Sequence, residues 1–163
     1  MTKFVSEKIR MRSSARLAAV QATYMIAYGQ LSVDEVIREF VNGEVGRYLI
    51  KEDTPDEEEM VAVEPMDAPY FTNLVKGVHK NKEQLEKSLA AYLNEGWSFE
   101  RMDGTLQALL LCAVYEISHT LDVDAKVIIK EYVDLAYAFF NKYEPKMVNA
   151  LLDGIAKSVR GEN

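Results

Sequence analysis

The sequence has a single cysteine and no long apolar run, and each of these absences excludes a class of protein. Cys112 has no second cysteine in the chain with which to form a disulfide, which suits a reducing compartment. No segment reaches the roughly 18 to 20 consecutive apolar residues that span a bilayer. The opening residues, MTKFVSEKIR, lack the apolar core of a signal peptide. We therefore expect a cytoplasmic protein with no membrane partner.

Residue clusters that carry catalysis or hold metals are missing as well. His79 and His119 are 40 residues apart and there is no cysteine pair, so the usual ligand spacing of a zinc site cannot be assembled. The sequence contains no GxxxxGKS/T, GxGxxG, GxSxG or HExxH motif. Acidic residues such as Glu131 and Asp134 share helix faces that are typical of solvated surfaces. We expect no cofactor and no metal.

Positive charge is scarce overall but concentrated near the start of the chain. The formal net charge is -7, from 26 acidic and 19 basic residues. This balance argues against non-specific coating of nucleic acid, although it leaves room for a local basic site. The segment EKIRMRSSAR supplies one, with Lys8, Arg10, Arg12 and Arg16.

Apolar residues recur three and four apart through almost the whole chain, which predicts an all-α protein. Ser13 or Ser14 is expected to cap a first helix that ends at Gly29. That start places arginines at the helix N-terminus, where the helix dipole disfavours them. A second helix is expected from the capping residue Ser32. The other expected helices are one over 69–96, one capped by Ser98, one capped by Asp124, and one with Glu144 as cap and Pro145 as first residue.

Each expected helix has an apolar stripe that should face a core. The stripes, in chain order, are Leu17, Val20, Tyr24, Tyr28; Val33, Val36, Ile37, Phe40; Phe71, Leu74, Val75, Val78, Leu85, Leu89, Tyr92; Met102, Leu106, Leu110, Ala113, Val114, Ile117; Ile128, Tyr132, Leu135, Phe139; and Val148, Leu151, Leu152, Ile155, Val159. The fourth of these helices is apolar nearly all round, since Leu109, Leu111 and Cys112 lie on its other sides, and it should be central.

Residues 44–67 differ in character from the rest. Nine of them are acidic, only Arg47 and Lys51 oppose these, and Pro55 and Pro65 interrupt the stretch. We interpret it as an acidic, largely irregular connection that aids solubility, with partner binding as the less favoured alternative. The only short strand candidate is YLIK at 48–51. The chain should therefore form two packed helical subdomains separated by this connection.

Several segments, taken together and in order, resemble the NusB family of bacterial transcription antitermination factors. They are ARLAAVQATYM, YFTNLVKGV, LLLCAVYEI, VDAKVIIKEYVDLAYAFF and EPKMVNALLDGIA. The resemblance covers about residues 10–160 apart from the acidic stretch. It implies an all-helical fold of two three-helix bundles within one domain over 1–163. The expected first bundle comprises 1–43 and 68–96, the acidic connection 44–67, and the second bundle 97–163.

The resemblance also implies a function without catalysis. Members of the family bind the boxA element in the leader of ribosomal RNA transcripts, as a heterodimer with the ribosomal protein NusE. The pair joins the RNA polymerase elongation complex, and some members form homodimers. The expected partners of this chain are therefore boxA-type single-stranded RNA, NusE and that complex. The alternatives are a helical adaptor that binds protein but little RNA and, less favoured, an accessory domain of an rRNA methyltransferase.

The resemblance assigns RNA contact to two regions. The first is the N-terminal arginine stretch, here Arg10, Arg12 and Arg16. If the helix extends back far enough, Lys8, Arg12 and Arg16 are four apart and form one stripe that could follow a phosphate backbone. The second region begins the last helix, and its residues in this chain are Lys146, Met147 and Asn149. Many members have an aromatic residue at the position of Met147.

The resemblance assigns protein contact to residues of two helices. Tyr24, in the first helix, matches a position that meets NusE, although its place on the apolar stripe also suits core packing. Glu100 and Leu106, near the start of the central helix, are expected to face the same partner. An acidic chain suits a basic ribosomal protein, because complementary charge speeds association.

Overall fold

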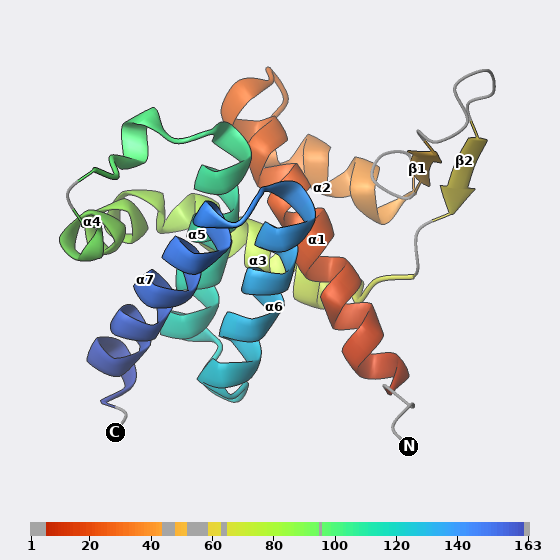
Figure 1. Cartoon of the computed structure of the whole chain (residues 1–163). Helices are drawn as coiled ribbons and strands as arrows, with labels where there is room; N and C mark the ends of the chain where they lie inside the picture. Colours follow the sequence, from red (N-terminus) through yellow and green to blue (C-terminus); the bar gives the residue numbers. More distant parts are fainter. Residues whose placement is uncertain (1–5, 44–47, 52–58, 63–64, 95, 162–163) are drawn as a thin grey trace. The chain divides into compact units, whose positions relative to one another are not determined.

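The computed structural model describes residues 6–43, 48–51, 59–62, 65–94 and 96–161. The chain divides into two compact units, residues 1–75 and 76–163. The first unit contains α1 (Glu7–Tyr28), α2 (Val33–Val41), β1 (Tyr48–Lys51), β2 (Glu59–Ala62) and the start of α3 (Ala68–Lys80). The second contains the end of α3, α4 (Lys82–Tyr92), the 3-10 turn η1 (Phe99–Arg101), α5 (Gly104–His119), α6 (Ala125–Phe139) and α7 (Tyr143–Arg160), as Figure 1 shows. Among the described residues, no helix combines the length and apolar character needed to cross a bilayer.

Helix α1 begins earlier than expected. Its cap is Ser6, whose hydroxyl oxygen accepts a 3.1 Å hydrogen bond from the backbone N–H of Ile9. The predicted caps Ser13 and Ser14 were wrong, because both lie within the helix. Glu7 occupies the first turn, where the helix dipole favours an acidic residue. The arginines therefore follow the helix start, and the expected conflict with the dipole largely disappears.

The buried face of α1 is built from alanines rather than from the predicted stripe. Ala15, Ala19 and Ala22 have no exposed surface, whereas Tyr24 and Tyr28 are 42% and 58% exposed. Small side chains allow close approach of a neighbouring element, and this places the longer tyrosines on the open side. The inward placement predicted for the two tyrosines was wrong, while that of Val20 is confirmed.

Helix α2 agrees with the sequence. Ser32 and Glu35 form a capping box: the hydroxyl oxygen of Ser32 accepts from the N–H of Glu35 at 3.1 Å, and the Glu35 carboxylate accepts from the N–H of Ser32 at 2.8 Å. Val36, Ile37 and Phe40 are buried, as predicted. The Phe40 ring stacks on that of Phe71, with 5.4 Å between centroids.

The acidic stretch contains more regular structure than expected. Strands β1 and β2 pair antiparallel, with Tyr48 opposite Ala62 and Lys51 opposite Glu59. The strand candidate at 48–51 is confirmed, but the description of 44–67 as largely irregular was wrong for these eight paired positions. A second segment in extended conformation, within reach along the chain, allows such a ladder to form.

The helix expected over 69–96 is two helices. The helix is interrupted at Asn81, between α3 and α4. The side-chain amide of Asn81 donates a 2.8 Å hydrogen bond to the carbonyl of Gly77. Asparagine competes in this way with regular helix bonding, so the chain turns there. Gly77 also provides space for the ring of Tyr115, because a Cβ atom at this position would overlap that ring.

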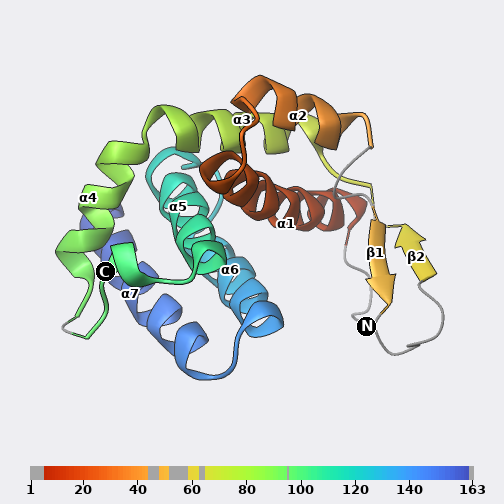
Figure 2. The same ribbon diagram turned by 90° about the horizontal axis from the view of Figure 1, so that it is seen from above.

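Helix α5 is the core of the second unit and contacts α4, α6 and α7 (Figure 2). Every residue from Ala108 to Val114 is buried, which confirms the predicted central helix. Its cap is Asp103, not the predicted Ser98, which precedes η1 instead. Glu116 is fully buried, and its carboxylate accepts a 2.6 Å hydrogen bond from the Tyr132 hydroxyl. Such a bond offsets part of the cost of burying a carboxyl group.

The last two helices follow the prediction except near their ends. Asp124 caps α6 as expected, but α7 begins at Tyr143 after Lys142 rather than at Pro145. Phe139 and Val159 were predicted to be buried and are 40% and 46% exposed. In α6 the buried stripe continues instead through Ala136. In the last turn of α7 the residue bonded to α5 is Arg160, whose guanidinium donates to the carbonyls of Ile117, Thr120 and Val123 at 3.0, 3.1 and 2.8 Å.

Candidate nucleic-acid interface

Helix α1 arranges the basic residues of the N-terminal region. Because the helix extends back to Glu7, Lys8, Arg12 and Arg16 are spaced four apart on one face, and the condition set for the predicted stripe is met. Their exposure falls along the helix. Lys8 and Arg10 are exposed, Arg12 is half-buried, and Arg16 is only 3% exposed.

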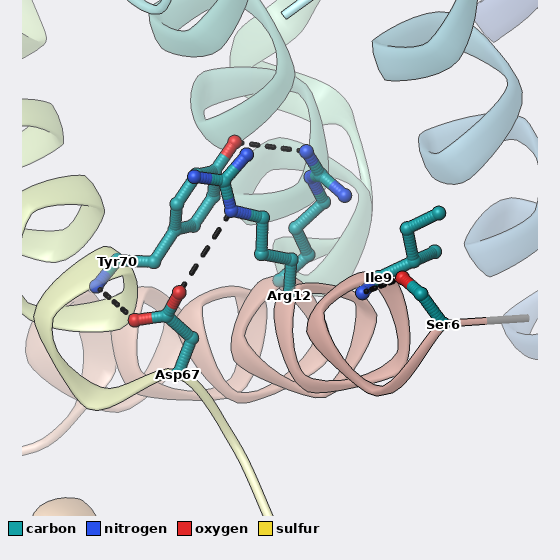
Figure 3. A network of polar contacts seen from close by, with 6 residues as sticks. Ser6, Ile9, Arg12, Asp67 and Tyr70 are labelled. Carbon is teal, nitrogen blue, oxygen red and sulfur yellow. Dashed lines mark hydrogen bonds and ion pairs between the residues drawn. The ribbon is translucent and has the colours of Figure 1, made fainter.

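Arg12 is held between an acidic and an aromatic side chain (Figure 3). Its Nε lies 3.8 Å from a carboxylate oxygen of Asp67, and its guanidinium lies 4.6 Å from the centroid of the Tyr70 ring. The other carboxylate oxygen of Asp67 accepts a 3.0 Å hydrogen bond from the N–H of Tyr70 at the start of α3. The N–H of Asp67 in turn donates to the carbonyl of Met11 at 3.0 Å. Arg12 is thus positioned by the last residue of the acidic stretch, Asp67, and by Tyr70 at the start of α3.

Arg16 contacts the same ring from deeper in the fold. Its Nη2 donates a 2.8 Å hydrogen bond to the Tyr70 hydroxyl, and its guanidinium lies 5.2 Å from the ring centroid. Arginine suits this place because its planar group can both stack and donate. In this arrangement the charge of Arg16 acts on Tyr70 rather than on a phosphate. Sequence reasoning missed Asp67 and Tyr70, which carry no signal beyond an acid and an aromatic at a helix start.

The second predicted RNA region lies at the start of α7. Lys146 and Asn149, three residues apart, are exposed on one face of the helix, while Met147 is half-buried. Between them Val148 is fully buried and anchors this turn. The structure therefore brings Lys146 and Asn149 together.

Exposed aromatic rings adjoin this turn and were missed as candidate contacts. Tyr137, Phe139 and Tyr143 are 57%, 40% and 69% exposed, and the Lys142 ammonium lies 5.9 Å from the centroid of the Tyr143 ring. Their position on or near an apolar stripe hid them, because the helical period alone does not show which turn of a stripe is covered. Exposed aromatic rings beside lysines provide stacking surfaces for nucleic-acid bases.

The predicted protein contacts differ in accessibility. The ring centroids of Tyr24 and Tyr28 lie 4.8 Å apart, and the two residues form an exposed aromatic pair on α1. Glu100 is exposed and accepts a 3.1 Å hydrogen bond from the Ser98 hydroxyl. Leu106 is only 2% exposed and belongs to the core of the second unit. In this conformation Leu106 cannot contact a partner directly, and it can act only by packing under residues that do.

A comparison with known families identifies the family of this chain. The family model of the NusB family matches residues 13–157. The chain belongs to the NusB family. It is 40% identical over 151 residues to the transcription antitermination protein NusB of Rhizobium leguminosarum bv. trifolii (strain WSM2304), which covers 93% of this chain and 89% of that protein. The predicted family is thereby confirmed, and it is a family of transcription antitermination factors rather than of enzymes.

Solved structures of the NusB family have the same fold. T. maritima NusB matches with a TM-score of 0.69 at 22% identity and covers 90% of each chain. A second match, from a complex of the antitermination factors NusB and NusE with dsRNA, has a TM-score of 0.68 at 19% identity and covers 92% of this chain and 98% of that one. These likenesses confirm the predicted all-α, NusB-type fold.

Proposed function

We propose that this protein is a transcription antitermination factor that binds boxA-type single-stranded RNA of ribosomal RNA transcripts together with NusE. The observation that carries the RNA role is the basic face of α1, where Lys8 and Arg10 are exposed and Arg12 is oriented by Asp67 and Tyr70. Lys146 and Asn149 on α7 supply the second contact region. A similar structure, of NusB and NusE in complex with dsRNA, supports NusE and RNA as the classes of partner.

The protein partner is proposed to meet the exposed Tyr24–Tyr28 pair and Glu100. NusE is a ribosomal protein, and a net charge of -7 on this chain favours association with a basic surface. In the same proposal the pair acts in the cytoplasm within the RNA polymerase elongation complex, and the free protein has a homodimer as a second state. The division into bundles 1–43 with 68–96 and 97–163 also stays a proposal.

A second function deserves a direct comparison, namely an adaptor that binds protein but little RNA. Two observations favour it: Arg16 is bonded to Tyr70, and Met147 offers no aromatic ring to a base.

RNA binding instead predicts a definite salt dependence. If Lys8, Arg10 and Lys146 each neutralise one phosphate, the logarithm of affinity should fall with the logarithm of salt at a slope of about -2. That slope weakens binding about 20-fold when salt rises fourfold.

The test is a titration of fluorescent boxA RNA with the full chain, with and without NusE, at several salt concentrations. We expect tighter binding in the presence of NusE. The double variant Lys8→Ala/Arg10→Ala should weaken binding and make the salt slope shallower by about 1.4. A matched control is Lys82→Ala/Lys87→Ala, which removes the same charge from exposed positions of α4.

Two outcomes separate the functions. Equal losses in the two double variants would mean that only net charge matters, and the role of α1 would be overturned. Binding of NusE with no RNA affinity at any salt concentration would establish the adaptor instead.

A further inference from the structure

Helices α6 and α7 enclose a groove of about 390 Å³ that the proposed RNA surface uses only in part. Its polar lining consists of Lys126, Lys130 and Tyr137 from α6, and Lys146, Asn149 and Asp153 from α7. We call this the α6–α7 groove. Its volume lies near the lower end of the roughly 300–1,000 Å³ that is usual for small-ligand sites.

The groove is positively charged although the chain is acidic. Three lysines and one aspartate line it. Two acids beside it are paired with lysines: Lys130 Nζ lies 2.9 Å from Asp134, and Lys157 Nζ lies 3.3 Å from Asp153. Glu131 also acts electrostatically on Lys130, so four lysines stand against three acidic residues, on a molecule whose net charge is -7. A local surplus of positive charge in such a chain favours a negatively charged ligand.

The interior of the groove suits a planar, partly apolar group. Ile129 and Val133 of α6 also line it, and Tyr137 stands at one end with 57% of its surface exposed. An exposed tyrosine ring next to aliphatic side chains is a surface on which an unpaired base can stack. Lys126 and Lys130 are four residues apart, one helical turn of about 6 Å, and lie farther along the same face.

We propose that the α6–α7 groove binds an unpaired segment of the RNA strand, with one base on the ring of Tyr137 and the following backbone phosphates at Lys130 and Lys126. This inference rests on the proposed function, because the groove shares Lys146 and Asn149 with the proposed RNA surface. That continuity favours RNA over an acidic peptide, which the same charges could attract. The strand therefore extends past the start of α7 and along α6.

The test compares RNAs that share one boxA core and are lengthened stepwise at either end. We expect the full chain to gain affinity when the added nucleotides reach the groove. Tyr137→Ala should remove that gain and weaken binding of the long RNA by roughly 5- to 150-fold, the range expected for loss of one stacked base. Tyr137→Phe keeps the ring and should bind nearly as the original chain does.

The lysines are tested through salt dependence. Lys126→Ala/Lys130→Ala should make the salt slope for the long RNA shallower by about 1.4 and leave the slope for the short core RNA unchanged. Lys82→Ala/Lys87→Ala again controls for net charge. All of these positions are exposed, so each variant is expected to unfold at the same urea concentration as the original chain.

Each result has a defined meaning. Unchanged binding of long RNA by Tyr137→Ala and Lys126→Ala/Lys130→Ala, while the original chain binds the core, overturns the groove and leaves the proposed function intact. Loss of NusE binding with RNA binding retained assigns the groove to a protein and also overturns the inference. If the original chain binds no RNA with or without NusE, the proposed function fails and the groove inference fails with it.

Discussion

The Nη2 atom of Arg16 donates a 2.8 Å hydrogen bond to the hydroxyl of Tyr70, a residue 54 positions away in the sequence. This bond separates the basic residues of α1 into two kinds. Arg16 is 3% exposed and belongs to the fold, whereas Lys8 and Arg10 are exposed on the first turns of α1. Arg12 is intermediate, since it lies over the same ring beside Asp67. The RNA affinity of α1 should therefore come from its first turns.

Tyr70→Phe tests the structural role of Arg16. The variant keeps the ring but removes the acceptor of the Arg16 hydrogen bond, so we expect the free energy of unfolding to fall by about 1–3 kcal/mol. Urea denaturation measures this change. The salt slope of RNA binding should stay the same, because no exposed positive charge is lost. Unchanged stability would contradict a structural role of this bond, and a steeper slope would mean that the released Arg16 contacts phosphate.

Met147→Phe should strengthen RNA binding. Met147 is half-buried at the start of α7, next to the exposed Lys146, and an aromatic ring there offers a face for stacking. A gain of about 1 kcal/mol, the lower end of the range for one stacked base, is about fivefold in affinity. The measurement is a titration with boxA RNA at fixed salt. Met147→Leu is the matched control, and an equal gain with leucine would rule out stacking as the cause.

Arg160→Ala should destabilise the second unit. The guanidinium of Arg160 donates to the carbonyls of Ile117, Thr120 and Val123, at and just beyond the C-terminal end of α5, where helix carbonyls lack partners within the helix. We expect the free energy of unfolding to fall by about 2–3 kcal/mol. Arg160→Lys should recover only part of the loss, because an ammonium group cannot reproduce the forked geometry.

The control for Arg160 is Lys157→Ala in the preceding turn. Lys157 forms an exposed ion pair with Asp153, and such pairs contribute about 0–1 kcal/mol. Denaturation midpoints of the three variants give the comparison. Equal destabilisation by Arg160→Ala and Lys157→Ala would contradict a special role for the carbonyl contacts.

Glu35 should make α2 sensitive to acid. Hydrogen bonds from Ser32 to the Glu35 carboxylate hold the pKa of Glu35 below its ordinary value of 4.5. The backbone N–H of Ser32 has the larger effect and its hydroxyl the smaller. Because the folded-state pKa is the lower one, this stabilisation is complete above the ordinary pKa and is lost as the pH falls through the folded-state pKa. We therefore expect Glu35→Gln, which cannot titrate, to show a weaker loss of stability over that acidic range.

Nuclear magnetic resonance titration of the Glu35 carboxyl carbon measures this pKa directly. Ser32→Ala should raise the pKa toward its ordinary value, because the hydroxyl is lost and the capping box is loosened. An identical Glu35 pKa in the Ser32→Ala chain would show that the hydroxyl has no part in the shift.

Interactions within a few residues were predicted well. The capping roles of Ser32 and Asp124, the buried face of α2 and the apolar character of α5 all follow from spacings of three and four residues. Helix ends were predicted less well, because several residues near each end can cap it. The structure selected Ser6 over Ser13 for α1 and Asp103 over Ser98 for α5.

By itself the sequence determined the all-α class, the family, and which residues could serve as basic or aromatic contacts. It did so because helical periodicity and family segments are local patterns along the chain. Only the tertiary structure decided that Arg16 is covered by Tyr70, that Leu106 is buried, and that Tyr137 is open beside the lysines of the α6–α7 groove. Exposure depends on partners far away in the sequence, and a helical stripe does not show which of its turns those partners cover.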